Sequence, residues 1–326
     1  MANQRKYITV AKFFEENEKE LKLEIIVNES GFDRQITETE IHRPGLALAG
    51  FVDVFSYNRI QVLGNTEVTY LKSLPAEVRR HDIQRLLEFQ IPLIVVTNKN
   101  PVDSELIKQC KRKKIPLLRS ALVSTEFVRY VNEYLSDVFA PQIVVHGTLI
   151  DVYGIGVLLT GRSGIGKSEV ALDLVERGHR LVSDDVVEIV RKAREILIGK
   201  TNSLLRHHIE LRGLGIVDVQ SMFGIRAIRI QKRVEIEVRL EDWDKQEDYE
   251  RLGLEDKFVD ILGVKIPLVR LPIFPGKNIT VIVETIALNQ LLKIHGINPA
   301  KKFNELQMKK IQEKKKLQQY LKSDYE

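Results

Sequence analysis

The sequence predicts an α/β protein of two domains, and three observations lead to this prediction. At 326 residues the chain is longer than one average domain. In its first half, short apolar runs alternate with segments of helical periodicity, a pattern typical of a parallel sheet. In its second half, residues 161–168 read G-x-x-x-x-G-K-S directly after an apolar run, as in a phosphate-binding loop. We expect an N-terminal α/β domain at 1–135 and a C-terminal domain at 136–326 that ends in a basic helix.

The composition is that of a soluble globular protein, with 44% hydrophobic and 29% charged residues. No apolar run approaches the ~20 residues that cross a bilayer, and the N-terminus lacks the apolar core of a signal peptide. We therefore expect a cytoplasmic protein with no membrane partner. The net charge is +5, but residues 300–326 alone hold eight lysines and four acidic residues. Because the excess lies mainly there, we expect a solvated helix and no nucleic-acid partner.

Elements of the first domain follow one another in a regular order. A helical pattern after residue 7 precedes a strand at 23–27. The single cysteine, Cys110, rules out an internal disulfide, and we interpret it as structural. No constellation of residues in this domain indicates catalysis. The further expected elements are a strand at 59–64, a helix at 75–89, a buried strand at 91–98, a helix at 104–114 and a strand at 115–118.

The boundary region is expected to form a helix at 124–140, capped by Ser124 or Thr125. After this helix, residues 142–161 read as two β runs that meet at Gly154. This pattern predicts a hairpin that leads into the phosphate loop.

The phosphate loop is the strongest functional signal in the chain. Its glycines allow successive backbone N–H groups to point at an anion, and a helix at 168–178 adds the positive end of its dipole. Lys167 is expected to reach the terminal phosphates and Ser168 to hold Mg²⁺. The alternative is a glycine-rich turn that enters an ordinary helix. The expected nucleotide-binding residues are Gly161, Arg162, Ser163, Gly164, Ile165, Gly166, Lys167 and Ser168.

Two adjacent carboxylates, Asp184 and Asp185, stand in an apolar run at 179–189 that we interpret as one short strand. Side chains alternate across a strand, so one of the two can face the phosphates. Such an acid can hold magnesium or accept a proton from an attacking hydroxyl. The alternative is a solvated strand end.

Residues 209–224 carry Glu210 and Arg212 before the turn Gly213–Gly215. Glycines on both sides of a leucine allow a tight backbone path near a ligand, and a carboxylate with an arginine suits a metal-phosphate site. A strand-turn-strand with a surface ion pair explains the pattern equally well. His207 and His208 are adjacent and are interpreted as structural.

Residues 272–277 form a proline-rich segment that ends in Lys277. A stiff loop of this kind can present one cation to a phosphate. Taken alone, a surface loop explains it better. We expect a strand at 278–284 after this loop, and then a helix.

These motifs together resemble the bifunctional HPr kinase/phosphorylase family. The loop GxSGIGKSE and the runs RGHRLVSDD, IELRGLGIVDV and RLPIFPGKN stand in that family's order and spacing. RPGLALAG and RIQVLGNTE in the first half resemble its N-terminal domain, so the likeness covers nearly the whole chain. Arg162 is a departure, because the family usually carries an acidic residue there.

The resemblance implies a serine kinase that uses ATP and Mg²⁺ to phosphorylate the phosphocarrier protein HPr, in control of carbon metabolism. It also implies removal of that phosphate with inorganic phosphate, which releases pyrophosphate. In such proteins the C-terminal P-loop kinase domains form a homohexamer, and the nucleotide site is similar to that of phosphoenolpyruvate carboxykinase.

The resemblance also assigns roles to positions of this sequence. Residues 209–218 correspond to a segment used in both directions of the reaction. Active-site residues correspond to His146, Lys167, Asp185 and Arg251, magnesium contacts to Ser168 and Glu210, and the dephosphorylation loop to Pro272, Ile273, Phe274, Pro275, Gly276 and Lys277.

Elementary chemistry agrees with these roles. Phosphoryl transfer requires positioning and charge neutralisation, which Lys167, magnesium and Arg251 would supply. We expect Asp185 to accept the serine proton in the forward direction and to return it in the reverse direction. A lone histidine at a strand end, such as His146, is structural about as often as functional.

Two other classes of function remain open on the sequence. A P-loop ATPase that acts on nucleic acid would present a longer apolar strand ending in Asp-Glu, whereas this chain has Asp-Asp after a short run. A nucleotide-sensing regulator that acts on a protein partner would need the loop but not Glu210, Arg251 and Lys277.

Overall fold

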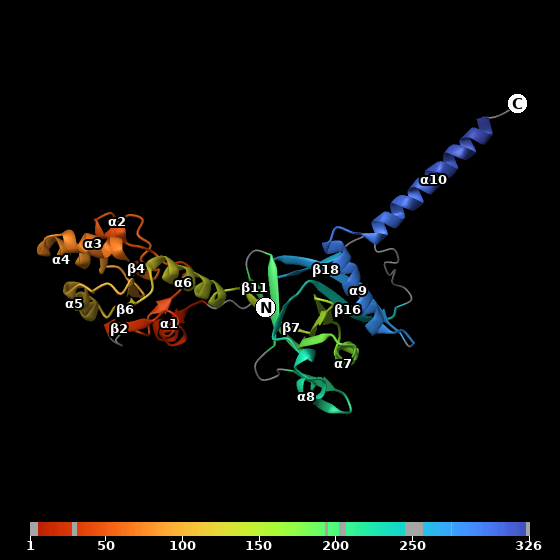
Figure 1. The fold of residues 1–326 in the computed structure, drawn as a ribbon, viewed down its shortest axis with the longest axis horizontal. Helices are drawn as coiled ribbons and strands as arrows, with labels where there is room; N and C mark the ends of the chain where they lie inside the picture. The colour runs from red at the N-terminus through yellow and green to blue at the C-terminus, as the bar shows by residue number, and fades with distance from the viewer. Residues whose placement is uncertain are drawn as a thin grey trace. The chain divides into compact units, whose positions relative to one another are not determined.

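The structure is a computed structural model that describes residues 6–27, 31–192, 195–201, 207–244, 257–274 and 276–323. The chain divides between Ala140 and Pro141 into two compact units, which we call the N-terminal and the C-terminal unit (Figure 1). Both units combine strands with helices, so the predicted two-domain α/β architecture is confirmed.

The N-terminal unit alternates strands with helices. Its elements are β1 (Ile8–Thr9), α1 (Val10–Asn17), β2 (Leu23–Val27), β3 (Gln35–Ile36), α2 (Gly45–Leu48), β4 (Gln61–Leu63), α3 (Asn65–Ser73), α4 (Ala76–Leu86), β5 (Ile94–Val96), α5 (Ser104–Lys113), β6 (Leu117–Ser120) and α6 (Ser124–Val138).

The main sheet of this unit has the strand order β2-β6-β5-β4. Strands β4, β5 and β6 run parallel, as predicted. The expectation of a parallel sheet is wrong for strand β2, which pairs with β6 in the antiparallel direction. It can do so because β2 and β6 are far apart in the chain and no crossover helix joins them directly.

Strand β5 shows why this sheet reads as a continuous apolar run. Ile94 and Val96 pack into a cluster with residues of α3, α4 and α5, whereas Leu93 and Val95 pack into a second cluster with α1 and α6. Both faces of the sheet are therefore covered, as parallel sheets require.

The predicted cap of α6 by Ser124 or Thr125 is wrong. Val123 occupies the N-cap position and makes no side-chain capping bond. The Ser124 hydroxyl instead lies 2.7 Å from Thr97 Oγ1 and accepts a 2.9 Å hydrogen bond from Asn98 Nδ2. Ser124, which was expected to cap the helix, therefore connects its first turn to the residues that follow β5.

The C-terminal unit is richer in strands. Its elements are β7 (Gln142–His146), β8 (Thr148–Val152), β9 (Ile155–Thr160), α7 (Lys167–Glu176), β10 (Arg180–Ser183), β11 (Val186–Lys192), β12 (Ile196–Lys200), β13 (His208–Leu211), β14 (Gly215–Asp218), α8 (Val219–Phe223), the 3₁₀ turn η2 (Ile225–Ala227), β15 (Gln231–Arg233), β16 (Ile236–Asp242), β17 (Lys257–Ile261), β18 (Val264–Ile273), α9 (Ile279–Ile294) and α10 (Pro299–Ser323).

Two sheets form the centre of this unit. The larger has the order β10-β8-β9-β16-β18-β17 and the smaller the order β15-β12-β11-β7. The predicted hairpin before the phosphate loop is confirmed, since β8 and β9 pair antiparallel with Val152 opposite Ile155. The first of the two expected β runs is not continuous. It is interrupted at Gly147, and its first part, β7, joins the smaller sheet. A Cβ atom at Gly147 would lie 2.6 Å from the Leu159 carbonyl oxygen, so only glycine fits this break.

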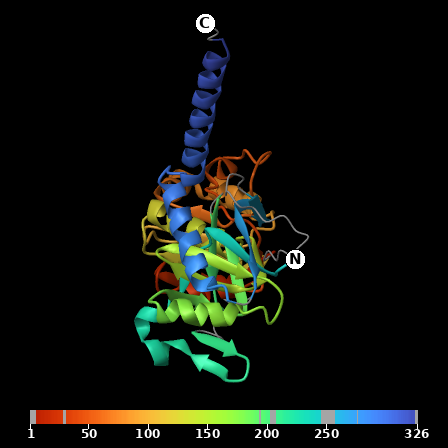
Figure 2. The same ribbon diagram turned by 90° about the vertical axis from the view of Figure 1, so that its right-hand side faces the viewer.

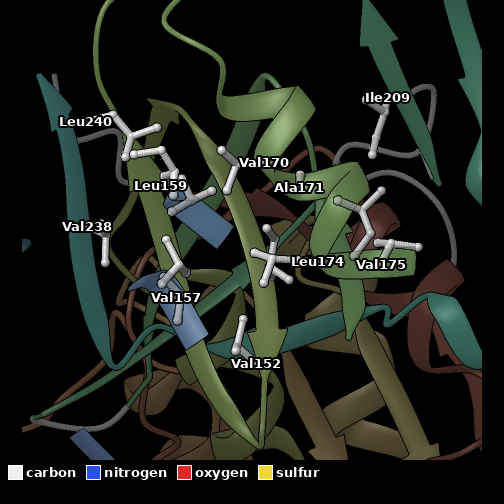
Figure 3. Packing of buried hydrophobic residues seen from close by; sticks show 14 of the residues in the cluster. Val152, Val157, Leu159, Val170, Ala171, Leu174, Val175, Ile209, Val238 and Leu240 are labelled. Carbon is white, nitrogen blue, oxygen red and sulfur yellow. The ribbon is translucent and has the colours of Figure 1, made fainter. Parts of the chain in front are cut away.

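The larger sheet packs on both of its faces. Side chains of β8, β9 and β16 on one face form a core with α7 and α9 (Figure 3), in which Val170 and Leu174 of α7 lie near Val157 and Leu159 of β9. Leu158, which points to the opposite face, packs in a separate cluster with residues of β11 and β12. The unit therefore has three layers, namely helices, the larger sheet and the smaller sheet.

The strand expected at 278–284 is wrong, because this segment begins helix α9. Asn278 caps the helix, and its side-chain oxygen accepts a 3.1 Å hydrogen bond from the Val281 backbone N–H. Ile279, Val283 and Ala287 are buried at helical spacing. Burial of one helical face therefore overrides the strand preference of the β-branched residues.

The basic C-terminal segment forms helix α10, which leads away from the sheets (Figures 1 and 2). All side chains from residue 301 to residue 320 are exposed, which confirms the predicted solvated helix. No helix among the described residues is both long enough and apolar enough to span a membrane.

Cys110 is fully buried on α5, and burial raises the pKa of its thiol to about 12. A thiol with this pKa stays protonated at pH 8, and the thiolate is the form that reacts. We predict that the native protein does not react with a disulfide reagent such as DTNB at pH 8, whereas the protein in denaturant releases one equivalent. Rapid reaction of the native protein would show that the thiol is accessible.

Candidate active site

The phosphate loop connects β9 to α7 and bends at its glycines. Gly161, Gly164 and Gly166 have φ values of 141°, 75° and 102°, which side chains other than glycine rarely adopt. The Lys167 ammonium donates to the backbone carbonyls of Gly161 and Arg162, at 3.2 Å each. The lysine therefore lies across the loop it belongs to, and the start of α7 faces the same space.

Strand directions explain why an acid meets this loop. Strand β10 is antiparallel to β8, and β8 is antiparallel to β9. Therefore β9 and β10 run in the same direction and end at the same edge of the sheet. The phosphate loop follows one of these ends, and Asp184 follows the other.

Asp184 is the acid that contacts the loop. Its Oδ2 accepts a 2.8 Å hydrogen bond from the Ser168 hydroxyl, and its Oδ1 accepts a 2.6 Å bond from the Thr148 hydroxyl. The Glu210 backbone N–H lies 3.4 Å from Oδ2. Asp184 is only 5% exposed, so a buried carboxylate connects three segments of the chain.

Asp185 occupies a different environment. The expected single strand at 179–189 is wrong, because a turn at Asp184 and Asp185 separates β10 from β11. Asp185 is exposed with a φ of 62°, and its carbonyl accepts a 3.0 Å hydrogen bond from Gly147 N. His146, also exposed, pairs with Val186 across the β7–β11 ladder. The structure thus brings His146 and the acid pair to the same strand ends.

The hairpin of β13 and β14 lies against the phosphate loop. Arg212, on its turn, lies 3.4 Å from the Ser163 hydroxyl through Nη2. A Cβ atom at Gly164 would lie 2.5 Å from the Arg212 guanidinium, so the arginine rests on the loop. Glu210 is exposed on the hairpin. A strand-turn-strand was one of the two interpretations of residues 209–224, and β13 and β14 pair in this way. The contact of Arg212 with the phosphate loop is a finding of the structure.

Arg162 forms a two-bond ion pair with Asp242 at the end of β16, with N–O distances of 2.6 and 2.8 Å. Hydrogen bonding to Arg162 lowers the pKa of the Asp242 carboxyl, and hydrogen bonding to Asp242 raises the pKa of Arg162. The positive charge of Arg162 is therefore matched by a neighbouring carboxylate.

The segment at 272–277 starts at the end of β18, which runs parallel to β16. The Lys277 ammonium donates to the Pro272 carbonyl at 3.2 Å and lies 5.0 Å from the centre of the Phe274 ring. The Phe274 ring is 5.4 Å from the ring of Trp243. Pro275, and the predicted catalytic Arg251, lie outside the described residues.

An open groove of about 770 Å³ lies between α7, the turn of the β13–β14 hairpin and the start of α9. The acidic residues Glu169 and Asp173 of α7 line it on one side, Arg212 on another, and Lys277 with Thr280 on a third. Among the described residues, no group of three or more His, Cys, Asp or Glu side chains is placed to hold a metal ion.

Three contacts at the site were not predicted. Thr148 and Asp242 lie far from the phosphate loop in the sequence, and no local pattern connects them to it. Asp184 was recognised as a candidate, but its contact with Ser168 was not. Asp184 stands directly after Ser183, the last residue of β10, and this position was the available signal, since the carboxyl ends of strands that run in one direction meet at one edge.

Comparison with known proteins identifies the family. The family model described as HPr Serine kinase N terminus matches residues 8–135, and the one described as HPr Serine kinase C-terminal domain matches residues 137–307. The chain is 51% identical over 302 residues to the HPr kinase/phosphorylase of Chloroherpeton thalassium, covering 92% of this chain and 89% of the relative. The chain belongs to the HPr kinase/phosphorylase family.

A second relative of the same name gives the same result. The protein of that name from Prosthecochloris aestuarii is 46% identical over 99% of this chain and 97% of its own length. A solved structure titled as the Hpr(Ser) kinase/phosphatase from Coxiella burnetii is 35% identical, covers 47% of this chain and 93% of its own, and has a TM-score of 0.44.

The different environments of the two acids lead to a prediction on stability. Asp184→Asn should lower the free energy of unfolding by about 2 kcal/mol, because it removes a buried charge that accepts two hydroxyl hydrogen bonds. Asp185→Asn should change it by less than about 0.5 kcal/mol, because the residue is exposed and asparagine tolerates a positive φ. Urea unfolding of both variants tests this, and equal losses would contradict it.

Proposed function

We propose that this protein transfers the γ-phosphoryl group of ATP to a serine of the phosphocarrier protein HPr. It also removes that phosphate with inorganic phosphate, releasing pyrophosphate, and so serves in the control of carbon metabolism. The family membership supports the activity. The structural observation that carries it is a phosphate loop whose Ser168 hydroxyl is hydrogen-bonded to the buried carboxylate of Asp184.

The C-terminal unit is, in this proposal, a P-loop kinase domain with a nucleotide site like that of phosphoenolpyruvate carboxykinase. The strand, glycine loop and helix at β9 and α7 support this assignment. We further propose that the protein acts as a homohexamer in the cytoplasm.

Phosphate charge is, in this proposal, neutralised by residues of two segments, the phosphate loop and the turn between β13 and β14. The backbone N–H groups of the loop and the Lys167 ammonium would hold the phosphates of ATP. Arg212 adds a cation directly over Gly164. Because phosphoryl transfer needs little covalent chemistry from the protein, this placement of positive charge is the main catalytic contribution.

Magnesium fits the donor set at this position. The Ser168 hydroxyl, in the first turn of α7, and the Asp184 carboxylate, directly after β10, are oxygen ligands of the kind that Mg²⁺ prefers, and they are 2.8 Å apart. These residues, with Glu210, would hold the ion. When bound, it would neutralise charge on the phosphates.

In the forward direction the serine Oγ bonds to the γ-phosphorus, the bond from that phosphorus to the ADP oxygen breaks, and the serine proton passes to a carboxylate. In the reverse direction an oxygen of inorganic phosphate attacks the phosphoserine phosphorus, and serine leaves with the proton returned. We assign the proton transfer to Asp185, which is exposed and free of the hydrogen bonds that occupy Asp184 in the described structure. His146 and Arg251 complete the proposed catalytic set.

A first test uses the lysine of the loop. Lys167→Ala should lower the rate about a hundredfold or more in both directions, because both reactions place phosphates in one site. Rates of HPr phosphorylation and of phosphate-dependent dephosphorylation are measured on protein whose circular dichroism matches wild type. A folded variant with near wild-type kinase rate would refute the assignment.

A second test separates the two acids. Asp185→Asn should retain ATP binding and lose transfer to serine, because an amide cannot accept the proton although it preserves the shape. Nucleotide affinity and turnover are measured on the same sample, with Asp184→Asn in parallel. Loss of transfer with intact ATP binding in Asp184→Asn alone would assign the proton transfer to Asp184 instead.

A further inference from the structure

Helices α7 and α9 are joined by polar contacts at two levels. The Thr280 hydroxyl donates to Asp173 Oδ2 at 2.5 Å. The second level lies at the end of α7. Arg177, its C-cap, has Nη1 3.3 Å from Glu284 Oε2 of α9, and His179, which follows the helix, has Nε2 3.0 Å from Glu284 Oε1. The rest of the contact between the helices is apolar, with Val170, Leu174 and Val283 among its members.

The first contact lies close to both reactive segments. Asp173 belongs to α7, which begins at Lys167 of the phosphate loop. Thr280 belongs to the first turn of α9 and follows Lys277 by three residues. A single hydrogen bond therefore connects the helix that carries the phosphate loop with the helix that carries the Lys277 loop. Both of its residues also line the open groove that contains Lys277 and Arg212.

Packing alone does not explain a threonine at position 280. Thr280 is 3% exposed, and its neighbours in the first turns of α9, Ile279, Val281, Ile282 and Val283, are all apolar and β-branched. A valine would fill the same volume. A buried hydroxyl costs free energy unless it is hydrogen-bonded, and here its partner is a carboxylate, which makes a strong hydrogen bond.

We propose that Asp173 and Thr280 are a positioning pair that fixes Lys277 relative to the phosphate loop. The pair thereby supports the phosphate-dependent reverse reaction more than the forward reaction. This inference rests on the function proposed above. In the forward reaction the phosphates arrive on ATP, which the loop from Gly161 to Ser168 already holds. The reverse reaction must orient a free phosphate beside a phosphoserine, and two anions repel each other. A correctly placed extra cation reduces that repulsion, and a small displacement of it is costly.

The test compares single substitutions in the full-length protein. Thr280→Val keeps the shape and removes the donor, whereas Thr280→Ser keeps the donor. Thr285→Val is the matched control, because the Thr285 hydroxyl is on the same helix, is exposed, and bonds only to the Val281 carbonyl of its own helix in the contacts described. Glu284→Gln weakens the second level of contact and controls for general loosening of the two helices.

We expect Thr280→Val to raise the KM for inorganic phosphate in dephosphorylation about tenfold, and to leave kinase kcat and the KM for ATP within about twofold of wild type. Lys277→Ala should give the same directional pattern. Thr280→Ser should restore the wild-type KM, and Thr285→Val and Glu284→Gln should leave it unchanged. Equal losses in both directions, or the same rise in Glu284→Gln, would overturn the proposal.

A second readout does not depend on activity. Trp243 is the single tryptophan and contacts Phe274, on which the Lys277 ammonium lies. Its fluorescence emission should shift in Thr280→Val and not in Thr285→Val. Unchanged emission in Thr280→Val would contradict a role in placing the loop. If wild type itself lacks both reactions, the proposed function fails, while the emission still decides whether the pair holds the loop in place.

Discussion

The buried carboxylate of Asp184 is the group on which the geometry of the site depends. Removing a carboxylate from water costs several kcal/mol, and that cost is offset only when its oxygens are hydrogen-bonded. Here the Ser168 and Thr148 hydroxyls supply those bonds. The start of α7, the start of β8 and the end of β10 are thereby held together, and a negative charge is kept beside a loop shaped to bind phosphate.

The larger sheet brings the other charged groups to the same edge. Strands β9, β16 and β18 run parallel, so the phosphate loop, Asp242 and the Lys277 loop follow three neighbouring strand ends. The Arg162–Asp242 pair connects the first two of these ends, and the Phe274–Trp243 contact connects the last two. Charges that are more than a hundred residues apart in the chain therefore lie at one edge of the sheet, which suits a reaction that depends on electrostatic placement.

The sequence predicted those parts of the fold that follow from local patterns. The glycine spacing at 161–168 and the apolar run before it were sufficient for the phosphate loop. The alternation of strands and helices was sufficient for the parallel strands β4, β5 and β6 of the N-terminal unit. Segment 278–284 was predicted wrongly because Ile, Thr and Val favour strands. Asn278 is a good helix cap and was the signal that could have corrected this.

The contacts that complete the site could not be predicted locally. Nothing near Asp184 indicates that Thr148, 36 residues away, will donate to it, because that contact arises from the pairing of β10 with β8. The partner of Arg162 depends in the same way on the pairing of β9 with β16. The sequence identified both acids of the pair, but only the turn between β10 and β11 shows that Asp184 is buried and Asp185 exposed.

The central claim is that one phosphate site works in both directions with phosphate itself as the acceptor. The most direct measurement uses HPr that carries ³²P on its serine, incubated with the purified protein and unlabelled inorganic phosphate, with separation of the labelled products. The account predicts that the label appears in pyrophosphate and that its release requires added phosphate. Label that appears as orthophosphate at a rate independent of added phosphate would contradict it, because water would then be the acceptor.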